Sequence, residues 1–194
     1  MTPADHLPDG PQLLQLEREA RRRGTALEGV SLQGSWRLQR VWSRQPGRPA
    51  QWSSALLRGL AARLELQPLE PPAPGEGCGP TLGLKNAVSV GALELRFQGK
   101  ALLEGRRPLL WLLFERWQLC LGSQTLLQGS MPPAPPQRRP FFALIGSRTC
   151  PDPAAAGGGV RWLAARGRGG GLALWTLDHA AAPAPALSGE QRAE

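Results

Sequence analysis

The sequence has few of the residues on which common catalytic and metal sites depend. Its 194 residues include no tyrosine, two lysines, two histidines and three cysteines. His6 and His179 lie in the two polar ends of the chain, so we expect no Ser-His-Asp or Cys-His site. Cys78, Cys120 and Cys150 are odd in number and widely spaced, which argues against a disulfide framework or a zinc site. This cysteine usage is typical of a reducing, cytoplasmic compartment.

Long hydrophobic runs are also missing. The longest uninterrupted apolar run covers residues 109–114, whereas a helix that crosses a bilayer needs about 20 apolar residues. Asp5 and Asp9 lie in an N-terminal stretch without an apolar core, so we expect no secretory signal. The sequence shows no paired carboxylates and no phosphate-binding loop. It therefore predicts a non-enzymatic protein without a metal or a resident cofactor.

The residues that are abundant suggest one ordered domain with loose connections. The chain has 24 Gly and 20 Pro, which cluster in a few stretches, and a net charge of +8 that comes mostly from arginine. The length fits one domain. We expect a tail and helix over 1–24, a domain over 25–178 and a disordered tail over 179–194.

Two segments have the spacing of helices. Residues 11–23 begin with Pro11, which suits a first helical turn, and are followed by Gly24, which suits a helix end. A second helix is predicted over 52–66, where large apolar residues recur every four positions. The segment 67–83 is rich in Pro and Gly and is expected to be a flexible connection.

The rest of the chain alternates between apolar and polar residues, with turns between short segments. The first strand is expected over 32–42, and the clearest one over 109–121. The other predicted strands cover 84–90, 92–98, 100–104, 124–128, 141–147, 160–166 and 172–178. One or two helices before such a run predict a mainly β protein with an antiparallel, lipocalin-like (calycin-type) β-barrel.

Gly34-Ser35-Trp36 at the start of the first strand is the most informative short pattern. In a small closed barrel, a Gly-x-Trp at this place lays an indole across the barrel end, and an arginine from a late strand can stack on it. Arg166 is the expected arginine, and the role is one of closure. The other tryptophans that we expect in the barrel wall or around an apolar cavity are Trp111, Trp162 and Trp175.

The run 166–171, Arg-Gly-Arg-Gly-Gly-Gly, has two interpretations. It is similar to an arginine-glycine tract that binds nucleic acid, but it is short and lies between two apolar segments. Glycines at that place favour a β-hairpin turn. We expect the hairpin and no nucleic-acid partner.

Three segments together resemble the plastid-lipid-associated protein family, also called PAP/fibrillin, in a short cyanobacterial form. They are residues 32–38, residues 84–88 and the long stretch 162–175. The resemblance covers most of 27–178 in matching order and implies a lipocalin-like barrel, association with thylakoid membranes and binding of lipids or other hydrophobic molecules. The family's Tyr-Leu-Asp segment before the Arg-Gly pair has no counterpart here.

The expected function is thus binding of a lipid, pigment or quinone by a cytoplasmic protein, with peripheral contact to an anionic thylakoid surface. That contact would use the basic clusters Arg21, Arg22, Arg23, Arg138 and Arg139. Leu13, Leu14 and Leu16 either insert shallowly into the bilayer or pack on the barrel. A lipocalin-like bilin lyase for phycobiliproteins and a nucleic-acid-binding module are the alternatives.

Overall fold

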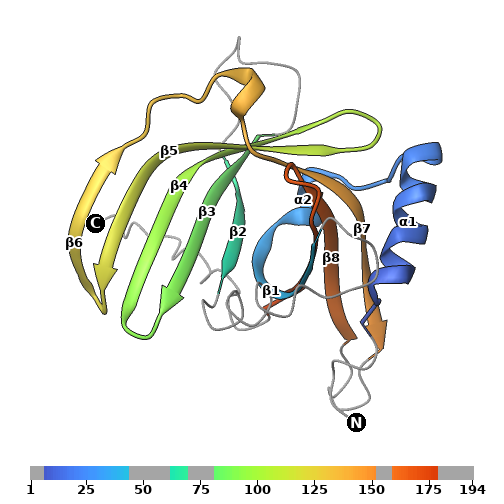
Figure 1. Cartoon of the computed structure of the whole chain (residues 1–194), viewed down its shortest axis with the longest axis horizontal. Coiled ribbons are helices and arrows are strands. Elements are labelled where there is room, and N and C mark those ends of the chain that lie inside the picture. Colours follow the sequence, from blue (N-terminus) through green and yellow to red (C-terminus); the bar gives the residue numbers. More distant parts are fainter. Residues whose placement is uncertain (1–6, 44–61, 70–80, 152–158, 179–194) are drawn as a thin grey trace, which may run out of the picture.

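The fold is a single antiparallel sheet bent into a near-ring, with one helix against its outside (Figure 1). The computed structural model describes residues 7–43, 62–69, 81–151 and 159–178. The helical elements are α1 (Gly10–Arg23), α2 (Gly29–Leu32) and the 3-10 turn η2 (Pro136–Arg138). The strands are β1 (Gly34–Trp42), β2 (Arg63–Pro68), β3 (Thr81–Val90), β4 (Leu93–Glu104), β5 (Leu109–Leu121), β6 (Gln124–Ser130), β7 (Phe141–Pro151), β8 (Gly159–Gly167) and β9 (Leu172–Leu177).

The strand order is β4-β3-β2-β1-β9-β8-β7-β5-β6, and an additional pairing of β4 with β5 joins the two arms of the sheet. Strand β5 is long enough to have three neighbours. It pairs with β4 along its length, with β7 through Leu109–Trp111, and with β6 through Arg116–Leu121. Strand β6 is therefore the last strand of the sheet, outside the near-ring. The prediction of a mainly β, antiparallel, barrel-like fold is confirmed.

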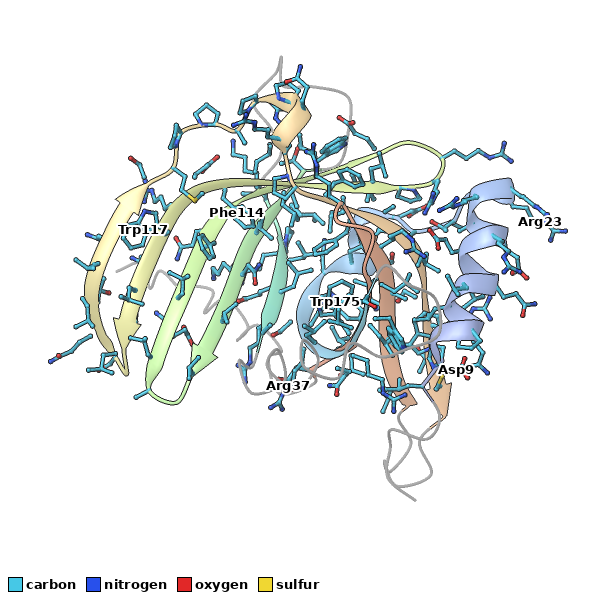
Figure 2. All side chains as sticks on the ribbon, in the orientation of Figure 1. Asp9, Arg23, Arg37, Phe114, Trp117 and Trp175 are labelled. Carbon is cyan, nitrogen blue, oxygen red and sulfur yellow. The ribbon has the colours of Figure 1, made fainter. Side chains whose placement is uncertain are left out.

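Side chains fill two cores, one on each side of the ring wall. The inner core holds Trp36 and Trp175 with the inward leucines of β2 to β5, and Figure 2 shows Trp175 within the ring. The outer core lies between α1 and the outward face of β7 to β9, around Leu13 and Trp162. Alternate residues of a strand face opposite sides, which explains how the same strands supply both cores.

Helix α1 begins and ends close to its predicted bounds, 11–23. The Asp9 carboxylate accepts a hydrogen bond from the backbone N–H of Gln12, and the Gln12 side chain accepts one from the Asp9 N–H. Such a capping box stabilises the first turn; Figure 2 labels Asp9 and Arg23 at the two ends of the helix. Leu13 is fully buried, and Leu14 and Leu16 pack beside it against the sheet. Of the two roles expected for these leucines, the structure shows the packed one.

The prediction of a second helix over 52–66 is wrong at its end, because residues 63–66 belong to strand β2. There Leu64 and Leu66 alternate with polar residues and face the inner core. Hydrogen bonding to β1 on one side and β3 on the other outweighs helix spacing in so short a segment. Residues 52–61 lie outside the described residues. Most of the expected connection 67–83 does too, but its first residues end β2 and its last residues begin β3.

The other strand predictions hold with small changes of length. The strand over 109–121 has the predicted bounds, while 92–98 and 100–104 form the one strand β4. In the first half of β5 the inward side chains are Leu110 and Leu112, so Trp111 between them faces the outer side of the sheet. A shift of register opposite Gln98 and Gly99 of β4 then changes which parity faces inward. In the part of the chain that the structure describes, no helix is long and apolar enough to cross a membrane.

Candidate functional site

Trp36 lies in the inner core, next to α2. Its side chain is fully buried, and its indole Nε1 donates a hydrogen bond to the backbone carbonyl of Leu32, 2.7 Å away, at the end of α2. Position 34 requires glycine for two reasons. Its φ is +130°, which other residues rarely adopt, and the Leu177 side chain packs so close that a Cβ at position 34 would lie 2.5 Å from Leu177 Cδ1. Trp36 is thus buried in the inner core and bound to the end of α2, and the closure role of the Gly-x-Trp pattern stays a prediction.

The arginine near Trp36 is Arg161, not the expected Arg166. The Arg161 Cζ lies 5.7 Å from the centre of the Trp36 ring, and its Nη2 donates to the backbone carbonyl of Ser31. Parity on β8 explains the difference, since Arg161 shares its face with the inward Leu163. Arg166, five positions on, faces outward. The Arg161 guanidinium thus connects β8 to both Trp36 and α2.

Arg166 binds Glu17 of α1 on the outside of the ring. Its Nε lies 2.7 Å from Oε1 of Glu17 and its Nη2 lies 2.5 Å from Oε2, a two-pronged contact, while Arg21 and Arg107 also donate to Oε1. The carboxylate is only 4% exposed. Burial by itself would raise the pKa of Glu17, but the hydrogen bonds and charges of Arg166 and Arg21 outweigh it and lower the pKa to about 2. The contact ties α1 to the ring wall.

The remaining predicted tryptophans do not share one site. Trp175 faces the inner core, with its ring centre 5.1 Å from that of Phe142. Trp162 faces the outer core under α1. Trp111 is half-buried on the outer face, where its Nε1 donates to Glu104. The structure therefore brings Trp36 and Trp175 into one core and places Trp162 and Trp111 on the other side of the wall.

A pocket of about 510 Å³ lies beside α2, and we call it the α2 pocket. Its size is within the range of small-molecule sites. Its wall is largely apolar and includes two exposed side chains, Val30 at 74% and Leu69 at 41% exposure. Other apolar residues of the lining are Leu27, Leu82, Leu103 and Pro108.

The polar groups of the α2 pocket are few. Gln33 contributes an amide, Thr81 a hydroxyl and Glu28 a carboxylate. Among the described residues that line the pocket there is no arginine or lysine. With one carboxylate and no basic side chain in this lining, the pocket is suited better to a neutral apolar molecule than to an anion.

Leu82 and Leu103 connect the α2 pocket to the inner core. Both belong to the inner core cluster, and each is less than a tenth exposed. The hydrogen bonds to the Leu32 and Ser31 carbonyls hold α2 against this wall. Trp36 and Arg161 therefore position the helix that forms one side of the pocket.

Sequence reasoning missed Glu17, Arg161 and the α2 pocket. Inward parity on the predicted strand 160–166 would have favoured Arg161 over Arg166. Glu17 gave no signal, because a single glutamate on an amphipathic helix is ordinarily solvent-exposed. The pocket depends on residues from four separate segments, which only the fold brings together.

The cysteines and histidines offer no reactive pair in the described residues. Cys120 is buried, with its Sγ 3.8 Å from the Thr125 hydroxyl, and Cys150 packs against the outer core. His6, His179 and Cys78 lie outside the described residues.

Comparison with known proteins gives no match to a family model, a curated protein or a solved structure. The resemblance to the PAP/fibrillin family accordingly stays a prediction.

Proposed function

We propose that this protein is a lipocalin-like, non-enzymatic binding protein for a neutral hydrophobic small molecule, and that the molecule binds in the α2 pocket. The observation that carries the proposal is the exposure of Val30 and Leu69 in an apolar pocket of ligand size. Covering these two side chains removes apolar surface from water, which is favourable by about 25 cal/mol per Å².

The contacts that hold α2 support this function because they make the pocket rigid. The Trp36 and Arg161 contacts hold α2 in place before any ligand arrives. A preformed pocket loses little conformational entropy on binding, which favours affinity.

The polar groups narrow the ligand class to neutral molecules, such as a quinone or an uncharged lipid. The Gln33 amide can hydrogen-bond to a carbonyl or hydroxyl, while Glu28 disfavours a carboxylate or phosphate. For the same reason a bilin, whose propionates need cationic partners, is a poorer fit to this pocket than a quinone. A bilin-lyase function is therefore the weaker proposal.

The arginine-glycine run lends no support to nucleic-acid binding. It forms the β8–β9 turn, in which Gly170 has a φ of +85°. Arg166 is bound to Glu17, and Arg168 donates to the backbone carbonyls of Gln137 and Arg139. Both guanidiniums are used within the fold.

The test is a fluorescence titration of the full chain with a fluorescent monoacylglycerol and with the matching fatty acid. We expect tighter binding of the neutral probe, and a gain in fatty-acid affinity in Glu28→Gln. Val30→Asp should weaken binding of the neutral probe at least tenfold. Val90→Asp is the matched control, since Val90 is also exposed but lies far along the sheet, at the β3–β4 turn. No binding, or equal binding by Val30→Asp and wild type, would refute the proposal.

A further inference from the structure

Exposed apolar side chains gather at one part of the sheet, away from the α2 pocket. Seven large apolar residues are exposed in the described part of the chain, and five of them lie on β6 or at the neighbouring ends of β3, β4 and β5. These five, which we call the distal apolar surface, are Val90, Leu93, Leu121, Leu126 and Leu127. Such a concentration on a soluble domain is typical of a contact surface.

Strand β6 is the edge of this surface. It pairs with β5 on one side and has no strand on its other side in the described part of the chain; Figure 1 shows it at the far end of the sheet from α1. An edge strand presents backbone N–H and C=O groups to which another strand can pair. The edge of β6 is seven residues long and bounded by Pro132 and Pro133, which directly follow Met131.

Strand β6 also lacks the usual protection of an edge. Monomeric proteins place charged residues, above all lysine, or proline on such strands. From Trp117 to Gln137 the sequence contains no Asp, Glu, Lys or Arg, although a fifth of the chain is charged. Leu126 and Leu127, in the middle of the strand, are 49% and 58% exposed.

The partner of this edge is a strand and not the interior of a bilayer. Backbone groups that lose water without gaining hydrogen bonds destabilise the inserted state by several kcal/mol each, so open sheet edges are not found in the hydrocarbon region. A second strand satisfies the same groups and covers the leucines at the same time.

A second copy of this chain can supply that strand at β6 in spite of the charge that the copies share. Each copy has a net charge of +8, so most contacts between copies bring like charges together. The uncharged β6 is a place where two copies meet without repulsion. Two identical edges related by a two-fold axis also match by symmetry.

We propose that β6 pairs antiparallel with β6 of a second copy, so that the two sheets continue into each other. Leu127 faces the same side as Leu119, its partner on β5, and the Trp117 indole lies against Gly129 on that face. With the axis near Leu127, this apolar face runs from one copy into the next. A seven-residue edge buries less than the usual 800 Å² per partner, so the association depends on protein concentration.

The test is sedimentation velocity of the full chain over a range of concentrations, with Leu127→Lys and the control Val90→Lys. Val90 is an exposed residue of the distal apolar surface, but it lies on β3, which β4 and β5 separate from the β6 edge, so it takes no part in the proposed strand pairing. The side chains of Val90 and Leu127 have similar exposure, 56% and 58%, and each variant adds one positive charge. We expect wild type and Val90→Lys to form dimers as concentration rises, and Leu127→Lys to stay monomeric at least tenfold higher in concentration.

Hydrogen exchange on the wild type gives a second readout that needs no variant. Backbone amides of residues 124–130 should exchange more slowly at high than at low protein concentration. A wild type that is monomeric throughout, or a Leu127→Lys that dimerises like the control, would overturn the proposal. Flotation of monomeric wild type with neutral vesicles that Leu127→Lys abolishes would overturn it in favour of a lipid surface.

Discussion

Replacing Glu17 with glutamine should cost about 3 kcal/mol of folding free energy at pH 7. The gap between the ordinary carboxyl pKa of 4.5 and the value of about 2 in the folded protein corresponds to that amount. The carboxylate is 4% exposed, but the side chains of its arginine partners are 20–58% exposed, so solvent screens part of the contact and this value is the upper end of the expected cost. The amide leaves the guanidiniums of Arg166, Arg21 and Arg107 without their shared anion.

The measurement is urea unfolding of wild type and Glu17→Gln at pH 7 and at several lower pH values. Because the folded pKa is depressed, the contribution of Glu17 is fully present above pH 4.5 and is lost as the pH falls toward 2. The difference between the two proteins should therefore shrink over that range. Glu19→Gln, on the exposed face of the same helix, should change stability by less than about 0.5 kcal/mol. Equal stability of Glu17→Gln and wild type at pH 7 would refute the assigned role of Glu17.

Further predictions concern the contacts of Trp36 and the basic surface. Trp36→Ala removes a fully buried ring and should cost about 3–5 kcal/mol in urea unfolding, and an unchanged midpoint would refute the closure role. Arg161→Met, which keeps length but loses the contacts to Trp36 and Ser31, should also destabilise the fold, and wild-type stability would show that those contacts are not needed. If the exposed arginines 21–23 contact an anionic bilayer, flotation with anionic vesicles should occur at low salt and vanish at high salt. Flotation that survives high salt, or none at low salt, would contradict peripheral contact through charge.

Local patterns in the sequence predicted the elements whose signals are repeated over many residues. Alternation over 109–121 and the turn glycines after Arg166 correctly predicted β5 and the β8–β9 hairpin. The capping residues around 11–23 did the same for α1. In these segments local preference and tertiary packing agree.

Sequence reasoning failed where partners distant in the chain decide the structure. Strand β2 shows only two inward leucines, Leu64 and Leu66, and is fixed by pairing with β1 and β3. The ion pair of Glu17 with Arg166 joins residues 149 positions apart. The arginine near Trp36 was predicted to be Arg166, although inward parity along the predicted strand 160–166 favours Arg161, which is the arginine found there.

The binding function is tested most directly by native mass spectrometry of wild type and Val30→Asp, purified side by side from the organism that makes the protein. We predict that the wild type carries a bound molecule, that solvent extraction identifies it as a neutral lipid or quinone, and that Val30→Asp has lost most of it. A wild type free of any bound molecule, or one retained equally in Val30→Asp, would contradict binding in the α2 pocket.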